Sequence, residues 1–69
     1  MRQIIKMVNT STGRTLAVYE KTEFIHGRWL TWYQIYELEN GTKIDCGTPS
    51  TNMILLIKEM VATLYGKEI

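Results

Sequence analysis

The segment from Arg28 to Leu38 constrains the fold most, because it holds both tryptophans and two of the four tyrosines of this 69-residue chain. The dipeptides His26-Gly27 and Asn40-Gly41 stand on either side of it. Such pairs reach the positive φ values that a two-residue hairpin turn requires. The segment is therefore predicted to be a strand with an antiparallel neighbour on each side. Its aromatic side chains alternate between the two faces of the sheet, and a single helix can cover only one face.

The other segments complete a small α+β domain that spans residues 1–69. Runs of β-branched and apolar residues predict strands over 2–8, 14–25, 28–38 and 42–46, and helical spacing predicts a helix over 49–65. We expect Thr48 to cap this helix, Pro49 to take its first position and Gly66 to end it in a left-handed conformation. The predicted fold is a four-stranded antiparallel β-meander with one C-terminal α-helix packed on one face (ββββα).

The two faces of the sheet follow from the pairing rule, since residues that oppose each other across two strands share a face. The face expected under the helix carries Ile4, Val8, Leu16, Val18, Phe24, Trp29, Tyr33, Ile35, Ile44 and Cys46. If Trp29 is a core residue, its replacement by alanine should lower the free energy of unfolding by about 3–5 kcal/mol. The opposite face mixes aromatic with charged residues: Tyr19, Lys21, Glu23, Arg28, Leu30, Trp32, Gln34, Tyr36, Leu38, Lys43 and Asp45.

Composition narrows the class of protein. Eight basic and seven acidic residues give a net charge of +1, too balanced for an acidic DNA mimic and without the basic excess of a duplex-DNA binder. A single cysteine forms no internal disulfide, so oligomerisation is the remaining aid for so small a fold, and we expect a homodimer. The N-terminal segment has no apolar run of signal-peptide length, and the longest apolar run, residues 53–57, is too short to cross a bilayer. A cytoplasmic protein without membrane contact is expected.

The residue types of an active site are scarce in this chain. Cys46 and His26 are the obvious reactive pair, but the predicted strands separate them by roughly 30 Å at about 3.3 Å per residue. Cys46 is better interpreted as a small buried apolar residue and His26 as a turn residue. The glycines are scattered and form no phosphate-binding loop. We therefore expect no enzymatic activity, no cofactor and no metal.

The open face supports two functional interpretations. In the favoured one it binds a protein, with Trp32 as the anchor, Tyr36 and Leu30 extending the apolar patch, and a basic rim that sets orientation. In the alternative, its aromatic rings stack the bases of single-stranded nucleic acid while the basic residues meet phosphates. The candidate site residues are the same for both: Tyr19, Lys21, Arg28, Leu30, Trp32, Tyr36 and Lys43. A third interpretation, in which two copies of the chain cover each other's open face and bind nothing else, also remains.

The apolar positions of the predicted helix span roughly half its circumference, which is wider than one contact surface needs. The helix is therefore expected to touch something besides its own sheet. Together, these features suit a small non-catalytic accessory or inhibitor protein of bacterial or phage type.

Overall fold

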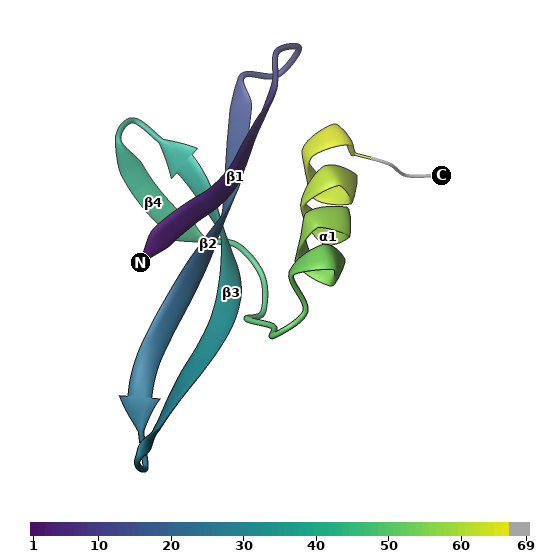
Figure 1. The fold of residues 1–69 in the computed structure, drawn as a ribbon. Coiled ribbons are helices and arrows are strands. Elements are labelled where there is room, and N and C mark those ends of the chain that lie inside the picture. Colours follow the sequence, from purple (N-terminus) through teal and green to yellow (C-terminus); the bar gives the residue numbers. More distant parts are fainter. Residues whose placement is uncertain (67–69) are drawn as a thin grey trace.

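A computed structural model describes residues 1–66 of the chain and confirms the predicted fold class (Figure 1). The strands are β1 (Arg2–Asn9), β2 (Arg14–Ile25), β3 (Arg28–Glu39) and β4 (Thr42–Asp45), and they are followed by the helix α1 (Met53–Tyr65). The strands form one sheet in the order β1-β2-β3-β4, and every neighbouring pair is antiparallel. Within residues 1–66, α1 falls short of the length and apolar character that a membrane-crossing helix requires.

Both predicted hairpin turns are confirmed by their backbone angles. His26 and Asn40 adopt φ values of 52° and 51°, and the glycine that follows each of them has a φ of 78°. Two consecutive residues with positive φ form the type I′ turn, whose twist matches that of the adjoining strands. The pairing of β2 with β3 then runs without a shift from Leu16 opposite Glu37 to Ile25 opposite Arg28. The predicted face assignment is therefore right for these two strands.

The predicted faces are wrong for β1. A bulge between Gln3 and Ile5 shifts its pairing with β2, which places Ile5 and Met7 against the core under the helix. Ile4, expected on that face, lies in the bulge, and Val8 pairs with Thr15 on the other face and is exposed. One extra residue moves every following side chain to the opposite face.

The helix begins later than predicted, at Met53 rather than near residue 49. Its N-cap is Asn52, whose Oδ1 accepts a hydrogen bond of 3.1 Å from the backbone N–H of Leu55. Thr48 and Pro49 belong instead to the connection that precedes the helix. Thr48 and Pro49 are residue types that favour a helix start, but Asn52 caps the helix instead.

That connection extends the sheet before the helix starts. Ser50 and Tyr33 exchange two backbone hydrogen bonds, of 2.8 and 3.0 Å, along the edge of β3 beyond the end of β4. At the other end of the helix, Gly66 adopts the predicted left-handed conformation, and its N–H bonds to the carbonyl oxygen of Ala62. The pairing of Ser50 with Tyr33 fixes where the connection leaves the sheet, and with it where the helix begins along the sheet.

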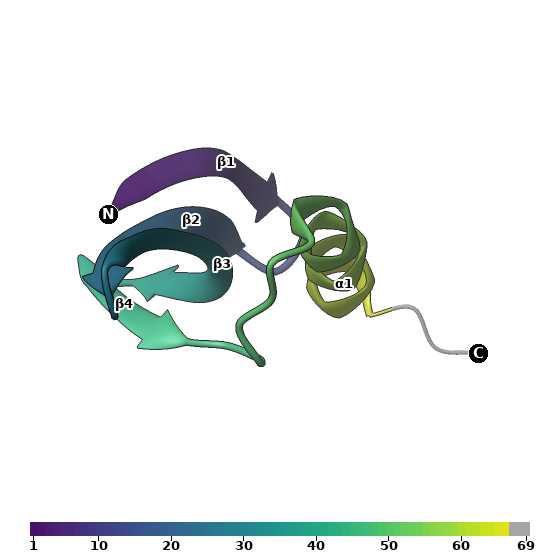
Figure 2. The ribbon, with the colours of Figure 1, turned by 60° about the horizontal axis from the view of Figure 1, so that its bottom comes forward.

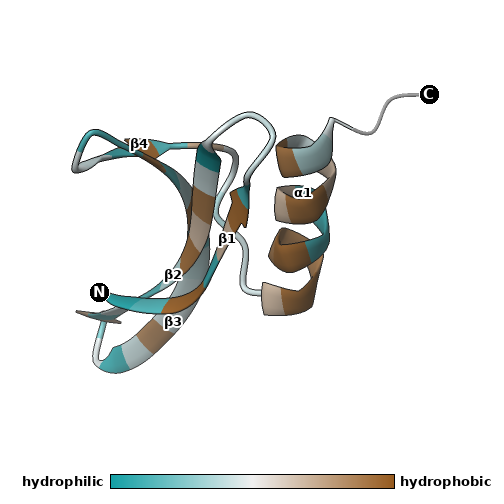
Figure 3. Ribbon diagram, turned by 90° about the horizontal axis from the view of Figure 1, so that it is seen from above, coloured by the Kyte–Doolittle hydropathy of each residue, from teal (hydrophilic) through white to brown (hydrophobic). Residues whose placement is uncertain are grey.

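The core lies between α1 and one end of the sheet. Its fully packed members come from β2, β3 and the helix: Leu16, Val18, Ile35, Leu56, Met60 and Leu64. Ile5, Met7, Tyr33, Cys46 and Ile57 pack around them, as predicted for Tyr33 and Cys46. In Figure 3 the side of the helix ribbon that lies next to the sheet is coloured mainly as apolar.

Two aromatic residues expected in this core lie outside it. Phe24 is 58% exposed and Trp29 is 69% exposed, because the β2–β3 hairpin runs on past the N-terminal end of α1 (Figure 1). Ile44, also expected in the core, is 46% exposed on the short strand β4. The predicted loss of 3–5 kcal/mol on truncation of Trp29 is therefore wrong for a single chain, since the side chain has little packing to lose.

An ion pair joins the start of β2 to β3. Arg14 donates from Nε to Glu37 Oε2 at 2.8 Å and from Nη2 to Glu37 Oε1 at 2.9 Å. The hydrogen bond from Arg14, followed by the attraction of its charge, lowers the pKa of Glu37 below its ordinary value of 4.5. Because the pKa is lower in the folded chain, the pair stabilises the fold above about pH 4.5, and this contribution is lost as the pH falls through the lowered pKa.

Glu37→Gln should therefore make stability less sensitive to acid. We expect the free energy of unfolding in urea to fall less steeply below pH 4.5 in this variant than in the unmodified chain. Glu39→Gln, at the exposed end of the same strand, is the matched control and should retain the steeper fall. Equal slopes for the unmodified chain and Glu37→Gln would show that the ion pair has no part in acid unfolding.

Candidate functional site on the concave sheet face

The sheet is strongly curved, and α1 lies against its convex side (Figures 2 and 3). The opposite side, here called the concave face, is covered by no helix. Strand pairing places cross-strand rows of side chains on it, one running from Lys6 through Ala17 and Tyr36 to Asp45. Its members are Gln3, Lys6, Val8, Thr15, Ala17, Tyr19, Lys21, Glu23, Ile25, Arg28, Leu30, Trp32, Gln34, Tyr36, Leu38, Lys43 and Asp45.

An aromatic cluster occupies the centre of the concave face. The rings of Tyr19 and Tyr36 meet edge to face, with centroids 5.4 Å apart and planes at 85°. The hydroxyl of Tyr19 donates to Gln3 Oε1 at 3.1 Å, and Lys43 Nζ lies 5.5 Å from the centre of the Tyr19 ring. The cation lies over the negative face of the ring, which is an attractive arrangement. Side chains from the three other strands thus hold Tyr19 in place.

Tyr36 supports this cluster rather than widening its exposed surface. It is only 8% exposed, so it does not extend the apolar patch around Trp32 as the sequence predicts. Gln34 is 5% exposed, and its Nε2 donates to the carbonyl oxygen of Gly47 at 2.9 Å. Curvature of the sheet brings these side chains together, so the centre of the concave face is filled by the chain itself. The alternation of residues along a strand gives no sign of that curvature.

The rest of the predicted site lies along the β2–β3 hairpin. Trp32 is half-buried and pairs with Lys21 across the two strands. Leu30 is exposed beside them, and Arg28 is exposed at the hairpin turn. The seven predicted residues therefore share one face but form two groups. Tyr19, Tyr36 and Lys43 lie at its centre, and the other four continue along the hairpin.

Sequence reasoning missed one basic residue of this face. The bulge in β1 places Lys6 opposite Ala17, on the concave side. The face then has four basic residues, Lys6, Lys21, Arg28 and Lys43, against the two acidic residues Glu23 and Asp45. No local signal in the sequence marks the bulge, so the excess of positive charge was underestimated by one.

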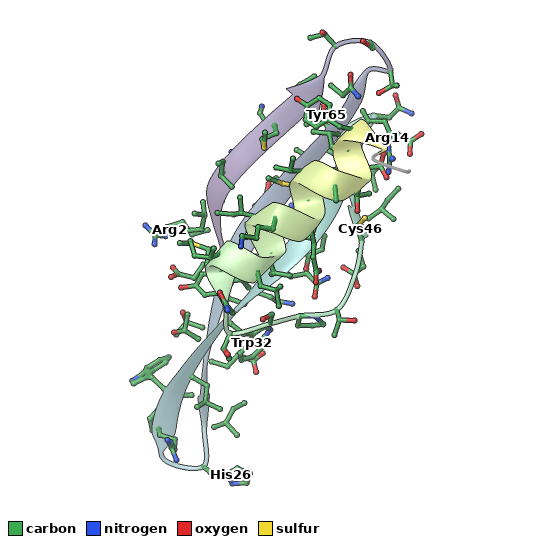
Figure 4. The ribbon with its side chains drawn as sticks, turned by 90° about the vertical axis from the view of Figure 1, so that its right-hand side faces the viewer. Arg2, Arg14, His26, Trp32, Cys46 and Tyr65 are labelled. Carbon is green, nitrogen blue, oxygen red and sulfur yellow. The ribbon has the colours of Figure 1, made fainter. Side chains whose placement is uncertain are left out.

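The reactive side chains of the chain lie apart. His26 is at the tip of the β2–β3 hairpin, while Cys46 lies next to the helix (Figure 4). Among residues 1–66, no three His, Cys, Asp or Glu side chains gather in a way that could hold a metal ion. The same part of the chain contains no detectable pocket.

Comparison with known proteins identifies no relative of this chain. No protein-family model, no curated protein and no solved structure matches the chain.

Proposed function

We propose that this chain is a small non-catalytic accessory protein that binds a protein partner through the concave face of its sheet. The observation that carries the proposal is the position of Trp32. This half-buried aromatic residue lies beside Lys21 on a sheet face that no element of the described chain covers. Tryptophan and tyrosine dominate the binding energy of protein interfaces because they bury a large area and keep a polar group.

The parts of the face have different roles in this proposal. Trp32 fills a pocket on the partner, and Leu30 extends the apolar contact along the hairpin. Lys21, Arg28 and Lys43 form a polar rim that guides approach and sets orientation.

The central cluster supplies rigidity. Tyr19 is held by Tyr36, Gln3 and Lys43 before any partner arrives. A side chain that is already fixed loses less conformational entropy on binding, so more of the contact energy is retained as affinity. Tyr36 contributes through this support and not through direct contact.

A second candidate function, binding of single-stranded nucleic acid, is favoured by two lysine–aromatic pairs. Lys43 lies over Tyr19, and Lys21 opposes Trp32. Platforms for unpaired bases combine stacking rings with basic side chains in this way. Burial of Tyr36 leaves two rings free to stack instead of three, and a surplus of two positive charges gives weak attraction to phosphates at physiological salt. A protein partner is therefore the better match.

Tryptophan fluorescence separates the two functions. In a Trp29→Phe background Trp32 is the single tryptophan, so its emission reports on the concave face alone. We expect no saturable change when a single-stranded oligonucleotide is added at low or at physiological salt. Saturable quenching that weakens with salt and is lost in Lys43→Ala would make the chain a single-strand binder and overturn the protein-binding proposal.

A further inference from the structure

The outer and flanking sides of α1 carry four large apolar residues beside two charged ones. Ile54, Leu55, Val61 and Tyr65 are between 37% and 57% exposed there, and the exposed Lys58 and Glu59 lie among them. These six residues are called the outer helix surface. A helix with large apolar side chains outside its sheet-facing side is typical of one that packs against a second surface.

A second apolar surface lies on the same side of the sheet, beyond the N-terminal end of α1. Phe24 and Trp29 pack edge to face there, with ring centroids 5.1 Å apart, yet both remain mostly exposed. Two residues farther from the hairpin turn, on the same face, the hydroxyls of Thr22 and Thr31 lie 3.4 Å apart. These four residues are called the bare hairpin surface. The helix covers one part of the convex side of the sheet and leaves this part open (Figures 1 and 4).

We propose that two copies of the chain form a two-fold dimer in which the outer helix surface of each protomer lies on the bare hairpin surface of the other. The dimensions of the two surfaces match. The hairpin overhang, residues 21–25, is about 17 Å long at 3.3 Å per residue, and the 13-residue helix is about 20 Å long. The step from the helix down to the bare strands is about one helix diameter, ~10 Å, which is the space that a second helix needs.

A two-fold rotation makes both contacts at once. With the strands of the two protomers running in opposite directions, each helix lies over the other protomer's hairpin, and the two helices share one layer between two sheets. Val61 and Tyr65, far from the axis, then meet Phe24 and Trp29. Lys58 lies nearer the axis, opposite the threonine hydroxyls.

The amount of uncovered apolar surface also fits a second copy. The six large side chains leave at most on the order of 700 Å² open on each protomer, so burying most of this area would approach the ~800 Å² per partner of a standard specific interface. A dimer built on helix–helix contact alone would leave Phe24 and Trp29 in water. The reciprocal arrangement covers both the outer helix surface and the bare hairpin surface. It leaves the two concave faces exposed on the outside of the dimer, so the dimer proposal does not depend on what the concave face binds.

Sedimentation velocity over a range of concentrations tests the dimer. Val61→Glu on the helix and Trp29→Glu on the hairpin should each raise the dimer dissociation constant by at least about 30-fold, the loss of one interface hot spot. Val8→Glu, at an exposed position on the opposite face, should leave it unchanged. A monomeric unmodified chain overturns the proposal, and so does dissociation by Val61→Glu but not by Trp29→Glu.

Cross-linking tests the reciprocal geometry directly. In a Cys46→Ser background, Trp29→Cys mixed with Val61→Cys should give a disulfide-linked mixed dimer on oxidation, since bridged cysteines need Cα atoms within about 7 Å. Either variant alone should give no linked dimer, because the proposed axis places like positions at opposite ends. Linkage of Val61→Cys to itself would instead show direct helix–helix pairing and overturn the proposal.

Discussion

Met60→Ala should remove a large part of the stability of this chain. Met60 is fully buried between Leu56 and Leu64, one helical turn away on either side, in the layer between the helix and the sheet. Truncating a buried methionine to alanine costs about 2–5 kcal/mol, through lost transfer energy and the cavity left behind. Native domains are stable by about 5–15 kcal/mol, and a chain of this size lies at the low end. Of a stability of about 5 kcal/mol, about 0–3 kcal/mol would therefore remain in the variant, and its urea midpoint is expected to fall by at least about two fifths.

Urea denaturation followed by circular dichroism measures this loss. Thr63→Ala is the matched control, because it changes an exposed residue of the same helix and should alter stability by less than about 0.5 kcal/mol. If Met60→Ala is too unstable to purify, Met60→Leu keeps the volume and should cost less than about 1.5 kcal/mol. Equal stability of Met60→Ala and Thr63→Ala would contradict the placement of the core.

The fold could be predicted because its deciding signals are local. A His-Gly or Asn-Gly pair adopts the hairpin turn with little help from the rest of the chain, and a two-residue turn fixes which residues oppose each other. The whole β2–β3 ladder follows from the turn at residues 26–27. The left-handed glycine at residue 66 is equally local, and it was predicted correctly.

The errors arose where distant parts of the chain decide the outcome. The position of α1 along the sheet depends on the backbone pairing of Ser50 with Tyr33, which no spacing rule reveals. That pairing leaves Trp29 in solvent, although its register on the strand was predicted correctly. The bulge at residues 3–5 moved Lys6 to the concave face, and the curvature of the sheet covered Tyr36. The face of the sheet on which a residue lies can be predicted from the alternation of residues along the strand. Whether that residue is buried depends on how far the helix extends over the face.

Trp32→Ala should abolish binding of the protein partner and leave the fold intact. Truncating an aromatic anchor at the centre of an interface costs 2 kcal/mol or more, an affinity loss of at least about 30-fold. The fold should survive because the main core lies on the other side of the sheet, between α1 and residues such as Val18 and Ile35. The measurement is affinity capture with the immobilised chain, followed by titration of the captured protein against each variant.

Ile44→Ala is the control for this experiment, because Ile44 is an exposed apolar residue on the helix side of the sheet, outside both proposed surfaces. It should bind the partner as the unmodified chain does. A partner retained equally by Trp32→Ala would remove the concave face from the interaction. Loss of binding together with loss of the folded circular dichroism spectrum would assign Trp32 to packing. Loss of binding with the fold retained is the combination that only a surface anchor produces, because a packing residue cannot be removed without a cost in stability.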